Sequence, residues 1–158
     1  MVLVIIGIIA GIAVPVMLTA ADAWSLASRF QDNAVSSAML VQNRMSREIR
    51  RLHNGTSVAV ADAAQFSFVD LDNNPINYNL SGNILMRNSD GLADNVTALN
   101  FTYYDDNDAP IDNPIVSPDN TDIRRIEVRF AILAGTNTLN FQFQVRPQNL
   151  NSLNEKFN

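Results

Sequence analysis

The chain has 158 residues and a formal net charge of −5, with no cysteine and a single histidine. This length accommodates one globular domain beside an extended segment. Because cysteine is missing, the chain has no disulfide framework, no thiolate metal site and no cysteine nucleophile. Its acidic balance is unlike that of nucleic-acid-binding proteins, which present a basic face, so we expect no nucleic-acid partner.

The first 18 residues contain no charged side chain, and the first charge in the chain is Asp22. Such a run is long enough to cross a bilayer, so we expect residues 1–21 to form the membrane-spanning part of a helix. Gly7 and Gly11 form a Gly-x-x-x-Gly pair, which allows helix backbones to approach closely. Pro15 removes a helical hydrogen bond and weakens the turn before it. These three residues are the candidate site of helix packing and assembly.

Residues 7–15, Gly-Ile-Ile-Ala-Gly-Ile-Ala-Val-Pro, resemble the N-terminal helix of type IV pilins and of the pseudopilins of type II secretion. In that family a prepilin peptidase cuts after a glycine, directly before a phenylalanine, and a glutamate follows. None of these processing residues is present, so none is carried over. We expect the natural start to lie upstream of Met1, which makes prepilin peptidase a partner. A secretory signal peptide and a simple single-span anchor are the alternatives, but neither explains both glycines and the proline.

Residues 22–53 have the apolar spacing of an amphipathic helix that continues the first segment. The stripe recurs every three or four residues and consists of Ala27, Phe30, Ala34, Ala38, Val41, Met45, Ile49 and Leu52. Its small alanines favour close packing against a flat partner, most simply a sheet. Arginines gather in the last turns, where positive charge suits the C-terminal end of a helix. Arg44 is spaced to pair with Glu48 at i,i+4.

Residues 54–158 change to the alternating pattern of β-strands and form a β-rich globular domain. We expect strands over residues 65–71, 76–80, 84–87, 96–104, 122–132 and 138–146, joined by turns rich in Asn, Asp, Gly and Pro. Arg125, Glu127 and Arg129 fall on the wet face of one of these strands. The predicted fold is therefore α+β. A long N-terminal helix, membrane-spanning in its first half and amphipathic in its second, packs on the dry face of an antiparallel β-sheet.

Four segments of this half resemble the W-type minor pilins of type IV pili and the J-type pseudopilins of type II secretion. They are residues 85–88 (Leu-Met-Arg-Asn), 92–104, 123–128 (Ile-Arg-Arg-Ile-Glu-Val) and 145–150. The resemblance implies a pilin-like fold and a low-abundance subunit that sits near a filament tip and helps to start assembly. It implies other pilin or pseudopilin subunits and an inner-membrane assembly platform as partners. Before assembly the subunit would cross the bacterial inner membrane once, and afterwards it would belong to a periplasmic or cell-surface filament.

Acidic residues crowd between two of the expected strands, and Asp105, Asp106, Asp108 and Asp112 form a candidate calcium site. Calcium takes about six to eight oxygen ligands, and some pseudopilins bind it. The EF-hand pattern is not met, because its glycine and its closing glutamate are both missing. A solvated loop made of turn-forming residues is the competing interpretation.

The sequence contains no catalytic constellation. It has one histidine, no Gly-x-Ser-x-Gly and no phosphate-binding loop, so we expect no enzyme activity and no cofactor apart from the calcium candidate. We predict instead a structural subunit, a minor pilin or pseudopilin, that assembles through its hydrophobic N-terminal helix. The alternative is a membrane-anchored or secreted β-rich module that binds a ligand and forms no filament.

Overall fold

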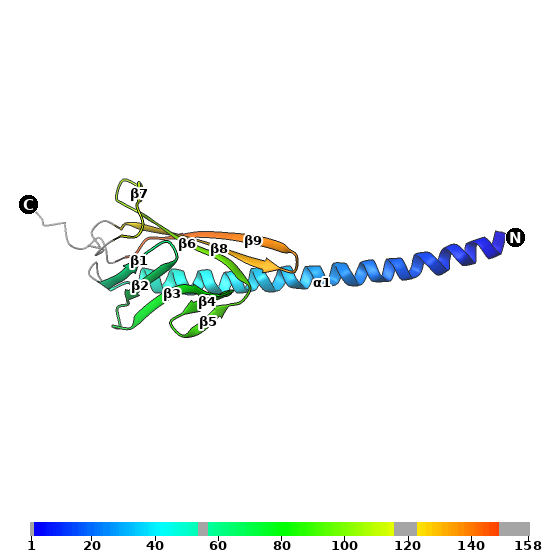
Figure 1. The fold of residues 1–158 in the computed structure, drawn as a ribbon, viewed down its shortest axis with the longest axis horizontal. Coiled ribbons are helices and arrows are strands. Elements are labelled where there is room, and N and C mark those ends of the chain that lie inside the picture. The colour runs from blue at the N-terminus through cyan, green and yellow to red at the C-terminus, as the bar shows by residue number, and fades with distance from the viewer. Residues whose placement is uncertain (1, 54–56, 116–122, 149–158) are drawn as a thin grey trace, which may run out of the picture.

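One long helix precedes a β-rich domain in the computed structural model, which describes residues 2–53, 57–115 and 123–148. The side chains of residues 2–16 and 18 lie outside this description. Helix α1 (Val2–Arg50) has 49 residues and is therefore about 73 Å long at ~1.5 Å per residue. Its N-terminal part projects far beyond the β-domain (Figure 1).

The strands of the β-domain form two antiparallel sheets. The first sheet is a meander in chain order, made of β1 (Val58–Ala61), β2 (Gln65–Val69), β3 (Pro75–Ser81), β4 (Ile84–Arg87) and β5 (Asp90–Ala93). The second sheet has the order β7-β6-β8-β9 and contains β6 (Val96–Tyr104), β7 (Pro110–Ile111), β8 (Arg125–Ala134) and β9 (Asn137–Val145). Each sheet therefore uses one continuous part of the chain.

The predicted fold class is wrong in two respects. The β-domain has two sheets where an antiparallel sheet was expected, and the molecule is sheet-rich, with nine strands to one helix in the described residues. The expected membrane-spanning half is also contradicted, because no helix in the described part of the chain combines the length and hydropathy needed to cross a membrane. From residue 19 onward α1 carries the charges of Asp22, Arg29 and Asp32, which a bilayer interior disfavours.

Most of the expected strands are confirmed. Phe66 and Phe68 lie on one strand face and are both buried, and β2 pairs with β3 in antiparallel orientation. Three strands were missed. β1 (Val-Ala-Val-Ala) is apolar throughout and shows no alternation, β5 begins with the turn-forming pair Asp-Gly, and β7 has only two residues. β5 forms where a turn was expected.

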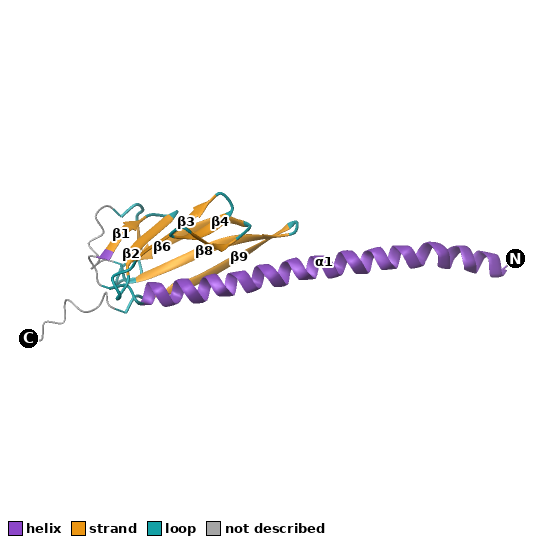
Figure 2. Cartoon of the chain, turned by 90° about the horizontal axis from the view of Figure 1, so that it is seen from below, coloured by secondary structure: helices purple, strands orange, loops and turns teal. Residues whose placement is uncertain are grey.

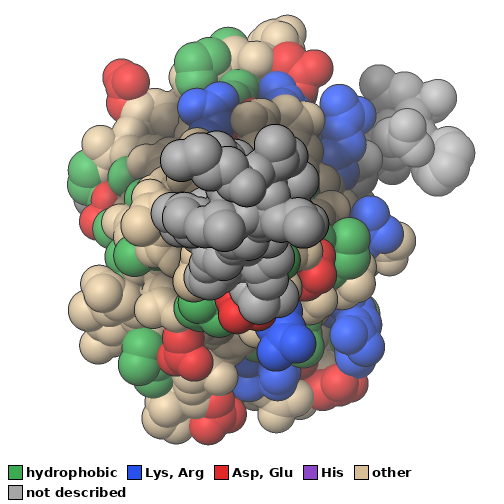
Figure 3. Space-filling view, turned by 90° about the vertical axis from the view of Figure 1, so that its right-hand side faces the viewer, with side chains coloured by type: hydrophobic (Ala, Val, Ile, Leu, Met, Phe, Trp, Pro, Cys, Tyr) green, Lys and Arg blue, Asp and Glu red, His purple; other side chains and the backbone are tan. Residues whose placement is uncertain are grey.

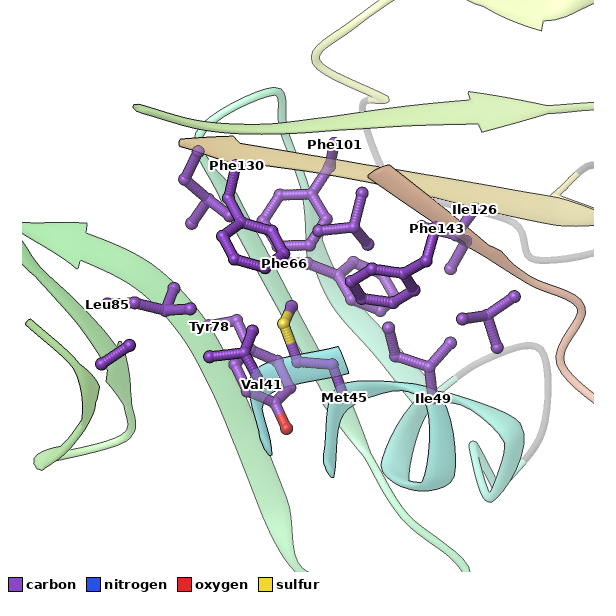
Figure 4. Close-up of a cluster of buried hydrophobic side chains, with 14 of the residues drawn as sticks. Val41, Met45, Ile49, Phe66, Tyr78, Leu85, Phe101, Ile126, Phe130 and Phe143 are labelled. Atoms are coloured by element: carbon purple, nitrogen blue, oxygen red, sulfur yellow. The ribbon is translucent and has the colours of Figure 1, made fainter. Parts of the chain in front are cut away.

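The C-terminal part of α1 supplies one side of the hydrophobic core. Its buried side chains are Ala34, Ala38, Val41, Met45 and Ile49, followed by Leu52 just beyond the helix. Figure 4 shows three of them, Val41, Met45 and Ile49, directed at aromatic and aliphatic side chains from both sheets. Seen from below, α1 runs along one side of the β-domain (Figure 2), where it packs mainly on β8 and β9 and also touches β5.

The aromatic rings of the two sheets meet in this core. The ring of Phe66 from the first sheet lies 5.8 Å from that of Phe101 and 5.7 Å from that of Tyr103 in the second sheet, between centroids. Ala27 and Phe30, which were expected on the packing stripe, are exposed. The covered part of the helix is therefore shorter than the amphipathic pattern indicated.

The outer face of the second sheet is drier than expected. Glu127 is only 3% exposed. Its Oε2 accepts hydrogen bonds from Gln144 Nε2 at 2.8 Å and from the Tyr104 hydroxyl at 3.4 Å. Arg129 Nη2 lies 2.6 Å from Oε1, but it is not aligned for a hydrogen bond, so this contact is an ion pair. The alternating pattern therefore predicted the direction of the Glu127 side chain correctly, but its exposure to solvent wrongly.

Two methionines of α1 provide a matched test of this packing. Met45 is fully buried and Met39 is 60% exposed. We expect Met45→Ala to lower the free energy of unfolding by roughly 2–5 kcal/mol, because it removes buried surface and leaves a cavity. Met39→Ala should change it by less than about 0.5 kcal/mol. Urea unfolding followed by circular dichroism measures both, and equal losses would contradict the packing described.

Candidate assembly interface

Residues 19–33 of α1 have no cover from the described part of the chain. Every described side chain from residue 19 to residue 33 is exposed, and Ala34 is the first buried residue of the helix among those described. The exposed side chains include large apolar groups: Trp24 is 81% exposed and Met17 is 73% exposed, and Leu26 and Phe30 are exposed as well. Water therefore contacts an apolar surface that extends along several turns of helix.

The β-domain covers α1 only as far as the tip of the β8–β9 hairpin. Gly135 occupies this turn with φ +65°, a conformation that suits glycine. A Cβ atom at this position would lie 3.5 Å from Cδ2 of Phe30, so the hairpin tip touches the helix there. Toward the N-terminus from this contact, the exposed part of α1 projects from the β-domain (Figures 1 and 2).

The exposed apolar side chains lie on more than one side of α1. At about 100° per residue, Met17 and Trp24 share one side of the helix, because they are seven residues apart. Leu26 and Phe30, four residues apart, share another side, roughly opposite the first. A helix that is apolar on several sides is typical of a buried environment. Neighbours on at least two sides would be needed to cover it.

Charges around this end of the molecule are mixed in sign. Figure 3 looks along the molecule from the N-terminal end of α1, and basic and acidic side chains are interspersed over the visible face of the β-domain. The apolar side chains of α1 therefore distinguish this end more than any charged surface seen in that view.

The sequence-predicted assembly residues Gly7, Gly11 and Pro15 all fall within α1, which continues without a break through Pro15. Their side-chain surroundings are outside the described part of the structure, so their role in packing stays a prediction. The sequence analysis missed Trp24 and Leu26. Their spacing was the available signal, because both are large apolar residues that fall off the packing stripe.

A charged cluster, which we call the Glu48 clamp, fixes α1 against the first sheet. The Glu48 carboxylate accepts a hydrogen bond from Tyr78 Oη at 2.5 Å. Arg87 Nε donates to both of its oxygens, at 3.0 and 2.8 Å. Arg44 Nε donates to Oε1 at 3.2 Å, which confirms the predicted i,i+4 pair. The clamp holds the direction in which the exposed part of α1 leaves the domain.

These contacts keep Glu48 charged. Burial alone would raise the pKa of the Glu48 carboxyl, but the hydrogen bonds from Arg87 and Tyr78 outweigh it, so the pKa lies below its ordinary value of 4.5. Burial, assisted by the neighbouring carboxylate, raises the pKa of the Tyr78 hydroxyl, which therefore remains a proton donor. The clamp is thus a charge-assisted network at neutral pH.

The four candidate calcium ligands do not converge on one point. Asp105 Oδ1 accepts hydrogen bonds from the backbone N–H groups of Asn107 and Ala109, which closes a turn. Asp108 is paired with Arg125 Nε at 3.0 Å. Asp106 accepts a hydrogen bond from the Asn107 side chain and Asp112 is exposed. Among the described residues, no group of three or more Asp, Glu, His or Cys side chains is arranged to hold a metal ion.

Comparison with known proteins finds no matching family model and no matching curated sequence. The resemblance to pilins and pseudopilins therefore depends on the residues of this chain.

The Glu48 clamp predicts a pH dependence of stability. Because the folded pKa of Glu48 is lowered, its stabilisation is fully present above the unfolded pKa, near 4.5, and is lost as the pH falls through the folded value. Glu48→Gln should lower the free energy of unfolding at neutral pH by about 2 kcal/mol. It should also flatten the loss of stability below pH 4.5. Denaturant titrations across this range measure both effects.

Asp32→Asn is the matched control for this prediction, since Asp32 is an exposed carboxylate on the same helix. It should leave the acid dependence unchanged. Identical pH profiles for Glu48→Gln and the original chain would contradict the role given to the clamp.

Proposed function

We propose that the protein is a structural subunit of a bacterial filament of the type IV pilus or type II secretion class, a minor pilin or pseudopilin. The observation that carries the proposal is the exposed apolar surface of α1, with Trp24 81% exposed, on a helix that projects from a folded domain. The sequence resemblance of residues 7–15 supports the same conclusion.

Exposure of the apolar surface of α1 to water costs free energy, and burial of that surface against another subunit would be favourable. Burying one large apolar side chain contributes roughly 1.5–3 kcal/mol. Met17, Trp24, Leu26 and Phe30 together would therefore contribute less than about 6–12 kcal/mol before the cost of association, because Leu26 is 54% and Phe30 44% exposed. Association itself costs about 4–15 kcal/mol. These four side chains alone give at most a weak contact, so stable assembly needs further surface, which the apolar residues 1–16 of the sequence supply.

A filament accounts for the distribution of this surface better than a simple pair of helices. Apolar side chains on two roughly opposite sides of α1 need neighbours on both sides. In a filament with its helices at the centre, each helix is surrounded by others. Gly7 and Gly11 would allow close approach of those helices, and Pro15 would weaken the turn between them and the exposed segment.

The subunit's partners follow from this assignment. Other pilin or pseudopilin subunits would cover α1, and an assembly platform of the inner membrane would add the subunit to the filament. Prepilin peptidase would process the chain if its natural start lies upstream. The role in starting or capping a periplasmic or cell-surface filament derives from the resemblance to W-type and J-type subunits. No enzymatic step is part of the proposal.

Trp24 gives the most direct variant. We expect Trp24→Asp to reduce incorporation into sheared surface filaments at least tenfold, because it places a charge at a helix contact that excludes water. Immunoblots of the sheared fraction against whole cells measure incorporation. Leu71→Asp is the matched control, since Leu71 is also an exposed apolar residue but lies in a turn of the first sheet.

The melting temperature of both variants should stay within about 2 °C of the original, because each changes an exposed side chain. Normal incorporation of Trp24→Asp, or equal loss with Leu71→Asp, would contradict the assembly role of α1.

Gly11 tests the predicted close approach of helices. We expect Gly11→Leu to abolish incorporation while the β-domain stays folded, because a bulky side chain separates packed backbones. The same fractionation measures the outcome, with Ile12→Leu as the control that changes shape without adding bulk. Normal incorporation of Gly11→Leu would exclude this residue from the interface.

A further inference from the structure

The edge strands of the two sheets differ greatly in length. Both edges of the first sheet, β1 and β5, have four residues, and each shows a shift of register against its neighbour. The β7 edge of the second sheet has two residues and begins with Pro110. β9, at the other edge, has nine residues in unbroken register with β8.

β9 also lacks the features that normally prevent edge pairing. Its sequence, Asn-Thr-Leu-Asn-Phe-Gln-Phe-Gln-Val, contains no charged residue, no proline and no glycine, and no bulge interrupts it. Protein edges are usually shortened, bulged or protected by Lys or Pro, as the other three edges of this domain are shortened. Within the described part of the chain, backbone pairing of β9 is with β8 alone. Alternate N–H and C=O groups of β9 therefore face outward.

We propose that β9 is a pairing edge, and that its partner is the β9 strand of a second copy of this chain, in antiparallel orientation. The two sheets would then join into one continuous sheet across a two-fold axis. This contact is separate from the exposed part of α1 and does not rest on the proposed filament function. A symmetric contact of this kind closes on itself and gives a dimer, not a filament.

The alternation of β9 is self-complementary, which is the reason to choose a second copy. With the two-fold axis at Phe141, Leu139 lies opposite Phe143 of the other copy, and Asn140 lies opposite its Gln142. Apolar residues then meet apolar residues on the core side, and amides meet amides on the outer side. A shift by one residue would place every amide opposite an apolar side chain, so the pattern excludes such a shift, and we choose the even register centred on the middle residue of β9.

Burial along β9 agrees with this pairing. Phe143 and Val145 are buried within the domain, whereas Leu139 and Phe141 are only partly buried. A partner strand would cover these two side chains. β9 carries no charged residue, so no repulsion between like charges opposes the contact.

Cysteine cross-linking tests the contact and its register, because the natural chain has no cysteine. In the proposed register Thr138 lies directly opposite Gln144 of the other copy, with Cβ atoms about 5 Å apart. Two Thr138 residues would be six positions apart along the strands, or roughly 20 Å. Differently tagged full-length Thr138→Cys and Gln144→Cys chains are therefore mixed and oxidised, and each is also oxidised alone.

We expect the mixture to form the disulfide-linked dimer at least tenfold faster than either variant alone. Thr138→Cys mixed with Asn100→Cys, an exposed position on the central strand β6, is the background control. Cross-linking of the mixture no faster than this control would overturn the proposal, as would equally fast cross-linking of Thr138→Cys alone. Cross-linking of the mixture no faster than the control is also the result expected if another segment pairs with β9.

A charge variant tests the same contact independently. Asn140→Lys combined with Gln142→Lys places lysines directly opposite each other across the axis and should slow cross-linking at least tenfold. Asn100→Lys on β6 should not slow it. Trp24→Asp should also leave the cross-link unchanged, so failure of the β9 contact and failure of the filament proposal give different results.

Discussion

The constraint on which the whole molecule depends is the packing of one face of α1 against both sheets. Ala34 and Ala38 allow the β-domain to approach the helix closely, while Val41, Met45 and Ile49 reach the aromatic core. The sheets meet through side chains such as Phe66 and Phe101 and through backbone hydrogen bonds such as that from Phe101 N–H to Ala63 O, and the helix completes the core that they share. Since the Glu48 clamp also fixes its direction, the helix leaves the domain as a defined projection.

The same helix therefore has two environments along its length. Beyond the contact of Phe30 with the β8–β9 hairpin, its apolar side chains have no cover from the described part of the chain. The domain is stable through the covered part, which leaves the uncovered part available for contacts with other molecules. The unprotected edge of β9 is a second such surface, of a different chemistry, because it offers backbone hydrogen bonds in place of apolar side chains.

Periodicity predicted the long strands and the helix stripe, but it did not predict the layers. The alternation that buries Phe66 looks the same whether its strand shares a sheet with β6 or faces it, so the split into two sheets was missed. The short strands β1, β5 and β7 showed no clear alternation in the sequence. Glu127 was predicted to face solvent because alternation indicates the direction of a side chain but not how deeply it is buried. For the candidate site, the stripe predicted that Phe30 is buried, whereas it is 44% exposed and touches only the hairpin tip among the described residues. The stripe also gave no sign of Trp24, whose exposure depends on where the β-domain ends.

The most direct test of the account is to find what touches position 24 in the assembled state. A photo-crosslinking amino acid would replace Trp24 in cells that make filaments, with the same replacement at Leu71 as the comparison. The account predicts a covalent adduct between position 24 and another filament subunit in the sheared fraction, and none from position 71. Recovery of the position 24 variant in filaments without any such adduct would contradict the claim that other subunits cover α1.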